Sequence, residues 1–199
     1  MDNREIEIKI KLNNREALIK KVEALGARIV HEKTLSHDVM YDDGQGFFDK
    51  GRVLRLRTYG NGKNLLTYKE PNKTGNEHLL ERTEIQTWVS DAPTTDQILQ
   101  KLGFSPYRIK EKNAVHYDLD GFELEFHTLP FLGEFLEIEA EEERLKQILP
   151  RLGFSLQDGI NRDYTDLFQD FCKANNLPIN TPQTFDQERM FTPTPQQNL

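Results

Sequence analysis

The stretch REIEIKIKL, residues 4–12, decides the fold, because charged and apolar side chains alternate along it without interruption. Successive side chains of a β-strand point to opposite faces, so this period of two predicts a strand with one apolar and one ionisable face. The pattern recurs along the chain, with turn residues such as Gly60-Asn61-Gly62 and Asp120-Gly121 between the repeats. The expected strands are Arg4–Leu12, Arg28–Thr34, His37–Asp42, Val53–Tyr59, Asn64–Glu70, Leu80–Val89, Tyr107–Asp118, Gly121–Thr128 and Glu134–Ala140.

Four other segments have the apolar spacing and the end signals of helices. A glycine follows three of them, which is a common way for a helix to end. The expected helices are Arg15–Leu25, Thr95–Leu102, Glu142–Leu152 and Asp163–Ala174. Eight or nine strands with a few helices predict an α+β fold whose antiparallel sheet is large enough to curl and close into a barrel.

Composition limits the function classes. The chain has 199 residues, with 26 basic and 33 acidic side chains and a formal net charge of −7, which argues against a general nucleic-acid binder. Its apolar runs fall short of the ~20 residues that a membrane helix needs, and its start lacks the apolar core of a signal peptide. The single cysteine, Cys172, excludes an internal disulfide framework. A cytoplasmic protein without a membrane or nucleic-acid partner is therefore expected.

The end of the chain has a different composition. Residues 175–199, NNLPINTPQTFDQERMFTPTPQQNL, hold four of the nine prolines among Asn, Gln and Thr. This stretch has no apolar period, so the sequence predicts one domain over residues 1–174 and a disordered or loosely docked tail over 175–199.

The polar faces of the expected strands are almost entirely ionisable. One interpretation is a solvated outer face, and for a single strand it is the more common case. The charges are, however, sorted by strand, and the helices are too few to cover both sides of so large a sheet. The second interpretation is therefore a barrel with its charged face inward, lined by Lys9, Lys11, Arg55, Arg57, Lys69, Arg82, Lys110 and Lys112 and by about seven carboxylates.

Such a barrel cannot be dry. Like charges ~4 Å apart repel by roughly 4 kcal/mol at an effective dielectric constant of 20, and unpaired buried ions cost still more. The interior would hold water and would suit a polyanion, because Arg and Lys bind phosphate oxygens with charge-assisted hydrogen bonds. Clustered carboxylates offer oxygen ligands for Mg²⁺ or Mn²⁺. Metal, carboxylates and cations together are typical of phosphoryl or nucleotidyl transfer.

Several motifs resemble those of the CYTH domain family, also called triphosphate tunnel metalloenzymes. The stretch EIEIK at residues 5–9 resembles the family's opening ExExK, and the later motifs follow in the family's order. They are VLRLR at 53–57, LTYK at 66–69, ERTE at 81–84, KEK at 110–112 and LGEFLEIE at 132–139. The helix after LGEFLEIE and the segment RDYTDLF at 162–168 are similar to the class IV adenylyl cyclase branch.

This resemblance implies a closed eight-stranded tunnel, a triphosphate substrate and a divalent metal, Mg²⁺ or Mn²⁺. The expected reaction is conversion of ATP to cyclic AMP and pyrophosphate. The alternatives are hydrolysis of inorganic or thiamine triphosphate, and a non-catalytic module that binds a nucleotide or polyphosphate. Members of the cyclase branch often form dimers, so a homodimer is also an expectation.

The resemblance also implies roles for individual residues. Lys9 would touch the triphosphate or tune the nucleophile, and Glu84 would orient Arg82 or a metal-bound water. The expected metal ligands are Glu5, Glu7, Glu137 and Glu139. The expected phosphate-binding residues are Lys11, Arg55, Arg57, Lys69, Arg82, Lys110 and Lys112.

Two positions depart from the family pattern. His127 stands where the family usually has an aspartate metal ligand, and imidazole suits Mn²⁺ or Zn²⁺ better than Mg²⁺. Either Glu125, on the same face, substitutes for it, or a metal position is lost and the activity is weakened or absent. A third interpretation is that His127 is an ordinary surface histidine. Lys112 replaces a more typical arginine. Trp88 continues the face of Glu84 and Gln86, so it either packs or lies near a tunnel mouth, where it would stack on a base.

Overall fold

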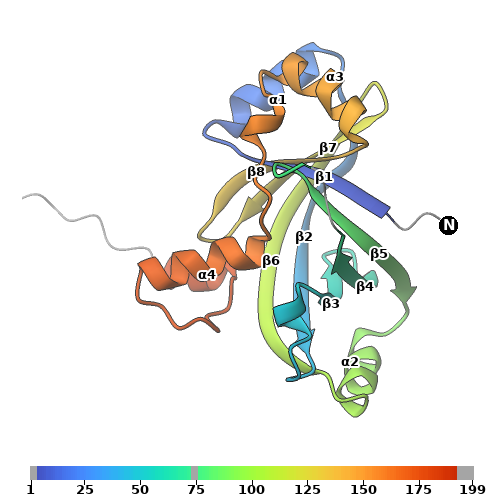
Figure 1. Cartoon of the computed structure of the whole chain (residues 1–199), viewed down its shortest axis with the longest axis vertical. Helices are drawn as coiled ribbons and strands as arrows, with labels where there is room; N and C mark the ends of the chain where they lie inside the picture. Colours follow the sequence, from blue (N-terminus) through green and yellow to red (C-terminus); the bar gives the residue numbers. More distant parts are fainter. Residues whose placement is uncertain (1–3, 73–75, 192–199) are drawn as a thin grey trace, which may run out of the picture.

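The computed structural model describes residues 4–72 and 76–191, and within them the strands close into an antiparallel barrel (Figure 1). The order around the barrel is β1-β5-β4-β3-β2-β6-β7-β8. The strands are β1 (Arg4–Lys11), β2 (Arg28–Asp42), β3 (Val53–Tyr59), β4 (Asn64–Pro71), β5 (Leu80–Val89), β6 (Ser105–Leu119), β7 (Phe122–Leu129) and β8 (Gly133–Glu139). The helices are α1 (Arg15–Ala24), α2 (Ala92–Lys101), α3 (Glu142–Leu152), α4 (Tyr164–Ala174) and α5 (Phe185–Phe191), with short 3₁₀ turns η1 (Phe48–Lys50) and η2 (Leu156–Asp158). The predicted closed eight-stranded barrel with flanking helices is confirmed.

Two of the nine expected strands form a single continuous strand. Residues 28–34 and 37–42 belong to β2, which pairs with β6 along almost its whole length. The register of this pair shifts at three places, between Ile29 and His31, between His31 and Thr34, and between Met40 and Tyr41. Such irregularities bend a strand, so β2 can follow the curve of the barrel without ending.

The boundaries of α2 differ from those expected at one end. The helix begins at Ala92, three residues before the expected start, because the carboxylate of Asp91 accepts a hydrogen bond from the backbone N–H of Thr94 at 2.7 Å. A proline follows in the first turn, where its missing N–H costs nothing.

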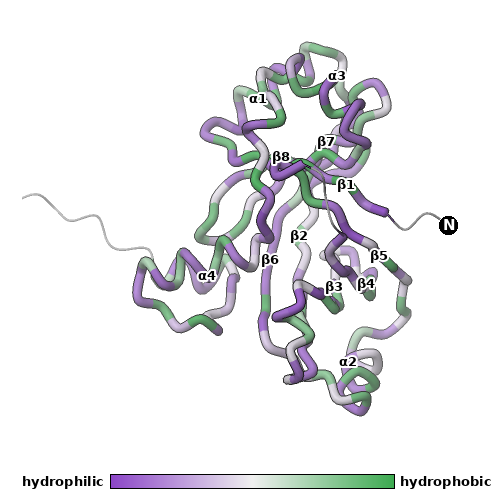
Figure 2. The backbone as a smooth tube through the Cα atoms, in the orientation of Figure 1, coloured by the Kyte–Doolittle hydropathy of each residue, from purple (hydrophilic) through white to green (hydrophobic). Residues whose placement is uncertain are grey.

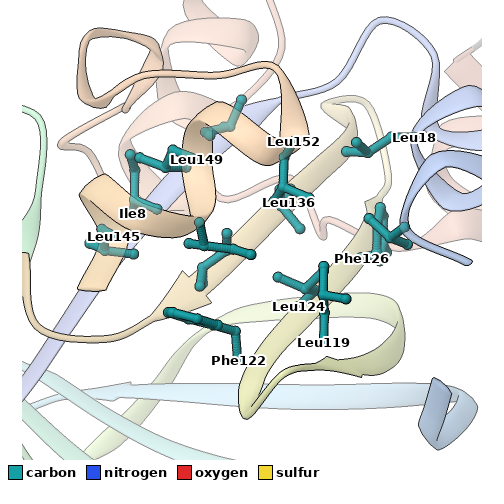
Figure 3. Packing of buried hydrophobic residues seen from close by; sticks show 14 of the residues in the cluster. Ile8, Leu18, Leu119, Phe122, Leu124, Phe126, Leu136, Leu145, Leu149 and Leu152 are labelled. Atoms are coloured by element: carbon teal, nitrogen blue, oxygen red, sulfur yellow. The ribbon is translucent and has the colours of Figure 1, made fainter. Parts of the chain in front are cut away.

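The apolar faces of the strands point outward, to the helices. Ile6, Ile8 and Ile10 of β1 are buried in one cluster with Leu145 and Leu149 of α3. Figure 3 shows this packing, and Figure 1 shows α1 and α3 side by side over β1, β7 and β8. Smaller apolar clusters lie under α2 and α4. Hydrophobic and hydrophilic residues alternate along the strands (Figure 2), so the ionisable faces are left to line the interior.

Residues 177–191 lie along the barrel wall, whereas a disordered or loosely docked tail was expected. Strand β7 pairs with β6 only from Asn113 onward, so the earlier part of β6 has a free edge on that side. Gln183 fills this edge: its backbone N–H donates to Ile109 O at 3.0 Å, and its carbonyl accepts from the N–H of Glu111 at 2.8 Å. Its side chain is fully buried. Residues 192–199, the rest of the expected tail, lie outside the described residues.

No helix in the described ranges is long and apolar enough to cross a membrane.

Candidate functional site

The inner faces of the strands enclose a charged cavity, here called the tunnel cavity. It has two parts of about 70 Å³ and 200 Å³, and they share the lining residues Glu7, Arg55, Arg57, Lys69, Lys112 and Glu137. The smaller part reaches the start of α4, where Asp163 and Tyr164 line it. The larger part reaches the opposite end of the barrel, where Glu84, Gln86 and His116 line it. The predicted inward orientation of the charged faces is therefore confirmed for most of the strands.

Cations outnumber carboxylates around Asp38. Arg57 donates two hydrogen bonds to this buried carboxylate, from Nε at 2.7 Å and from Nη2 at 2.8 Å. Arg55 lies 3.8 Å and Lys110 4.0 Å from the same carboxylate. Burial, helped by the nearby Arg55 and Arg57 and opposed by Asp38, lowers the pKa of Lys110 to about 7. Three cations thus share one negative charge, which favours a bound anion.

Two arginines that line the tunnel cavity also have a buried N–H group without an acceptor. Among the described residues, Arg55 and Arg82 each bury an Nε with no hydrogen-bond acceptor. Buried donors are normally paired, so an unpaired one marks a place where a ligand or water accepts. The other side of the Arg82 guanidinium is held by Asp163, with Nη2 and Oδ2 2.6 Å apart. An anion with several oxygens would satisfy both free groups.

Carboxylates gather at the other end of the tunnel cavity around Lys69. Its ammonium lies 2.7 Å from Glu5 and 3.1 Å from Glu84. Burial raises the pKa of Glu5 to about 8, and Glu7 and Glu84 add to this rise against the effect of Lys69. Burial and the neighbouring Glu84 also raise the pKa of Glu139. One lysine is therefore too little positive charge for these carboxylates, and a cation would relieve their repulsion.

Lys9 lies between the two halves of the site. Its ammonium is 3.1 Å from Glu7 and 3.1 Å from Glu137, and it lies 4.5 Å from the ring centre of Tyr164. Burial alone would lower the pKa of Lys9, but Glu7 and Glu137 outweigh it and raise the pKa. Lys9 is therefore a permanent cation that fixes two carboxylates and cannot act as a proton acceptor at neutral pH.

His127 is fully buried between two carboxylates. Its Nε2 lies 3.0 Å from Glu125, its Nδ1 lies 3.1 Å from Glu137, and the hydroxyl of Tyr164 is 3.3 Å from Nδ1. The ammonium of Lys112 is 3.0 Å from Nε2. One ligand atom each from Glu125, His127 and Glu137 lie within 4.8 Å of one another, a spacing that suits a metal ion.

The donor set fits a divalent cation. Six carboxylates lie along the larger part of the tunnel cavity, and burial, with Glu7 and Glu84 nearby, raises the pKa of Glu5 to about 8. Carboxylate oxygens are the ligands that Mg²⁺ and Mn²⁺ prefer, and the imidazole of His127 would favour Mn²⁺ over Mg²⁺. The side chains that could hold such an ion are those of Glu5, Glu7, Glu125, His127, Glu137 and Glu139.

Most of the residues expected at the site line the tunnel cavity, but two expectations do not fit. Lys11 lies beyond the end of the cavity and is exposed, with its amine on the carbonyl of Leu132 and 4.7 Å from the ring centre of Phe135. Glu84 contacts Lys69 and Gln86, whereas the partner of Arg82 is Asp163, so the expected orientation of Arg82 by Glu84 is wrong. The alternative role of Glu84 toward a metal-bound water stays a prediction. Lys11 is the last residue of β1, where the strand leaves the barrel, so its side chain is not enclosed by the other strands.

Sequence analysis assigned no site role to Asp163 and Tyr164. They stand at the start of α4, far along the chain from the charged strands, and alternation within strands carries no sign of them. For His37 and Asp38 the sequence favours a hydrogen bond at a strand edge over a role in substrate binding or proton transfer, but Asp38 lies inside the barrel under Arg57. The position of Asp38 in β2, two residues from both Ser36 and Met40, could have indicated that its side chain points inward.

Two of three comparisons with known proteins find relatives of this chain. The model of the CYTH domain matches residues 3–150. A Vibrio parahaemolyticus structure described as a candidate adenylate cyclase has a TM-score of 0.72 at 19% identity, covering 84% of this chain and 99% of that one. A Pyrococcus horikoshii protein has a TM-score of 0.71 at 27% identity, covering 82% and 98%.

A Hippeastrum protein named as an adenylyl cyclase, and described as having a dominant triphosphatase activity, has a TM-score of 0.60 at 20% identity, covering 84% and 96%. The search of curated proteins finds no match. The family model spans most of the chain, and the barrel agrees with the solved structures over nearly their whole length. This chain belongs to the CYTH domain family.

Proposed function

We propose that this protein is a divalent-metal-dependent enzyme that acts on a triphosphate held inside the barrel, and that it converts ATP to cyclic AMP and pyrophosphate. The observation that carries the proposal is the sharing of the Asp38 carboxylate by Arg55, Arg57 and Lys110. A buried excess of positive charge costs free energy, and a triphosphate is a compact anion that removes this cost.

The cationic residues would bind and orient the phosphates. Arg55 and Arg82 each have a buried Nε–H available for a phosphate oxygen. Lys69, Lys110 and Lys112 are placed around the same space as point charges. Arg57 is already fixed by Asp38, so its remaining N–H groups are held in a defined direction. Such fixed donors lower the cost of reorganisation when charge develops on the phosphate oxygens.

The carboxylates Glu5, Glu7, Glu137 and Glu139, with Glu125 and His127, would hold Mg²⁺ or Mn²⁺. When bound, the metal would neutralise charge on the phosphate oxygens and on the leaving group. Lys9 would keep Glu7 and Glu137 in place and contact the triphosphate, while Glu84 would position Lys69. These assignments to Lys9 and Glu84 are proposals.

In the cyclase reaction the ribose 3′-oxygen bonds to the α-phosphorus, the bond from this phosphorus to the bridging oxygen breaks, and pyrophosphate leaves. The 3′-hydroxyl proton passes to solvent or to a carboxylate of the larger part of the tunnel cavity. In hydrolysis, the second candidate, water attacks the terminal phosphorus instead. The smaller part of the tunnel cavity supports this candidate, because Arg55, Arg82 and Lys110 line it and such groups bind phosphate oxygens.

Product analysis tests the proposal. The protein is incubated with ATP, and separately with tripolyphosphate, in the presence of Mg²⁺ or Mn²⁺, with Glu137→Gln as the matched inactive control. Cyclic AMP with pyrophosphate supports the cyclase, and orthophosphate supports the hydrolase. Tight binding without any product under either metal would contradict the proposal of an enzyme and would support a non-catalytic binding module.

A further inference from the structure

A separate pocket opens beside the larger part of the tunnel cavity, and we call it the mouth pocket. It has a volume of about 310 Å³, and its wall includes His31, Asn61, Trp88 and His116. Arg57, Lys112 and Glu125 line both this pocket and the tunnel cavity, so the two spaces adjoin. The mouth pocket is at the barrel end away from α4, where β3 and β5 finish.

Trp88 is not a packing residue. It follows Glu84 and Gln86 on the inward face of β5, yet it is 61% exposed. Its ring centre lies 5.9 Å from that of Tyr59, and the ammonium of Lys63 is 5.8 Å from it. A tryptophan that stabilises a core is buried, so an exposed indole in a pocket wall points to a ligand surface.

The surroundings of Trp88 suit a flat aromatic ring with polar edges. Arg57 lies 5.7 Å from the ring centre of Tyr59, so the aromatic pair leads directly to the cations of the tunnel cavity. On the other side, His31 and His116 meet edge to face at 5.3 Å. Thr34, Ser36 and Asn61 add hydrogen-bonding groups to the wall. Stacking on an aromatic side chain is tolerant of base identity, because every base has a π-face.

We propose that the mouth pocket is a nucleoside subsite, in which the base of a nucleoside triphosphate stacks on Trp88 while its phosphates extend past Arg57 and Lys112 into the tunnel cavity. This inference rests on the proposed function of that cavity as a triphosphate site. It makes a nucleoside triphosphate a better ligand than inorganic triphosphate, because only the nucleotide fills both spaces.

Trp88 is the only tryptophan of the chain, so its fluorescence reports on this pocket alone. The full-length protein is titrated in EDTA with α,β-methylene-ATP and, separately, with tripolyphosphate. We expect the nucleotide to quench the fluorescence and tripolyphosphate to change it little, although calorimetry detects binding of both. Nucleotide binding that leaves the fluorescence unchanged would overturn the subsite.

Variants at this position separate stacking from structure. Trp88→Ala should weaken nucleotide binding on the order of tenfold and leave tripolyphosphate binding unchanged, whereas Trp88→Phe should retain most of the nucleotide affinity. Ile85→Ala is the matched control, because Ile85 is similarly exposed on the outer face of the same strand. Equal nucleotide affinity of Trp88→Ala and wild type would overturn the subsite while the triphosphate site stands. Failure of the wild type to bind either ligand would overturn the proposed function and the subsite with it.

Discussion

Arg57 of β3 donates two hydrogen bonds to Asp38 of the neighbouring strand β2, inside the barrel. The carboxylate holds Arg57 in one orientation, and it only partly offsets the positive charge of Arg55 and Lys110 beside it. The pair therefore has a structural and an electrostatic consequence, and the two arginines two residues apart on β3 should respond differently to substitution.

Replacing Arg57 by Met, which keeps the aliphatic stem, should lower the free energy of unfolding by about 3 kcal/mol, because it leaves Asp38 buried without its main partner. Arg55→Met should stay within about 0.5 kcal/mol of the wild type or be more stable, since it removes like-charge crowding. Urea denaturation followed by circular dichroism measures both. Equal losses of stability in the two variants would contradict the different roles of these arginines.

Triphosphate binding should take up a proton near neutral pH. Because the pKa of Lys110 is lowered to about 7, its amine is partly neutral at pH 7–8, and a bound polyanion favours the charged form. The affinity should accordingly fall as pH rises above about 7. Calorimetry in buffers of different ionisation enthalpy measures the proton, and in Lys110→Arg, which stays charged, the Lys110 contribution should disappear. An unchanged uptake in that variant would assign the proton elsewhere.

The lowered pKa of Lys110 also makes the stability of the folded protein depend on pH. Between about pH 7 and the ordinary lysine pKa, the unfolded chain holds more protons at Lys110 than the folded one, so the folded state gains stability as pH rises. Relative to Lys110→Arg, the wild type should become more stable from pH 7 to pH 9. Thermal melting of both proteins across this range provides the measurement.

Glu5 should behave in the opposite way. With its pKa raised to about 8, the folded protein holds a proton that the unfolded chain releases near pH 4.5, so the metal-free protein loses stability as pH rises through pH 5–8. Binding of Mg²⁺ or Mn²⁺ at pH 7 should expel this proton. Glu5→Gln should reduce both effects, and Glu16→Gln, on the exposed face of α1, should leave both intact.

His127→Asp should shift the metal preference toward Mg²⁺, because it replaces an imidazole by a carboxylate beside Glu125 and Glu137. The same change should lower the melting temperature of the metal-free protein, since three carboxylates would then crowd one buried place. Thermal melting with and without Mg²⁺ tests this, with His127→Asn as the uncharged control. If the Asn variant gains as much from Mg²⁺ as the Asp variant, the metal-ligand account of this position is wrong.

The barrel could be predicted from the sequence because the alternation of charged and apolar residues is visible within each single strand. The alternation in residues 4–12 and 132–139 identifies strands, and the sorting of charges by strand indicates an inward charged face. The pairing of Asp38 with Arg57 could not be read in this way, because it depends on the register between β2 and β3. Alternation along residues 53–57 places Arg55 and Arg57 on the same face and does not distinguish them.

Contacts between distant segments account for the other differences. Asp163 reaches Arg82 only because α4 lies at one end of the tunnel cavity, and Gln183 is buried only because β7 leaves part of the β6 edge free. The predicted helix Asp163–Ala174 gives no sign of the contact with Arg82, and the proline-rich composition around Gln183 is more typical of a loose tail.

The most direct test of the central claim, that the charged interior holds a triphosphate, is calorimetric titration of tripolyphosphate into the wild type and Arg55→Met in EDTA. We expect one site per chain in the wild type, and an affinity at least on the order of tenfold weaker in the variant, because a charge-assisted hydrogen bond is lost from an otherwise stable barrel. No binding to the wild type, or equal binding to both proteins, would contradict the claim.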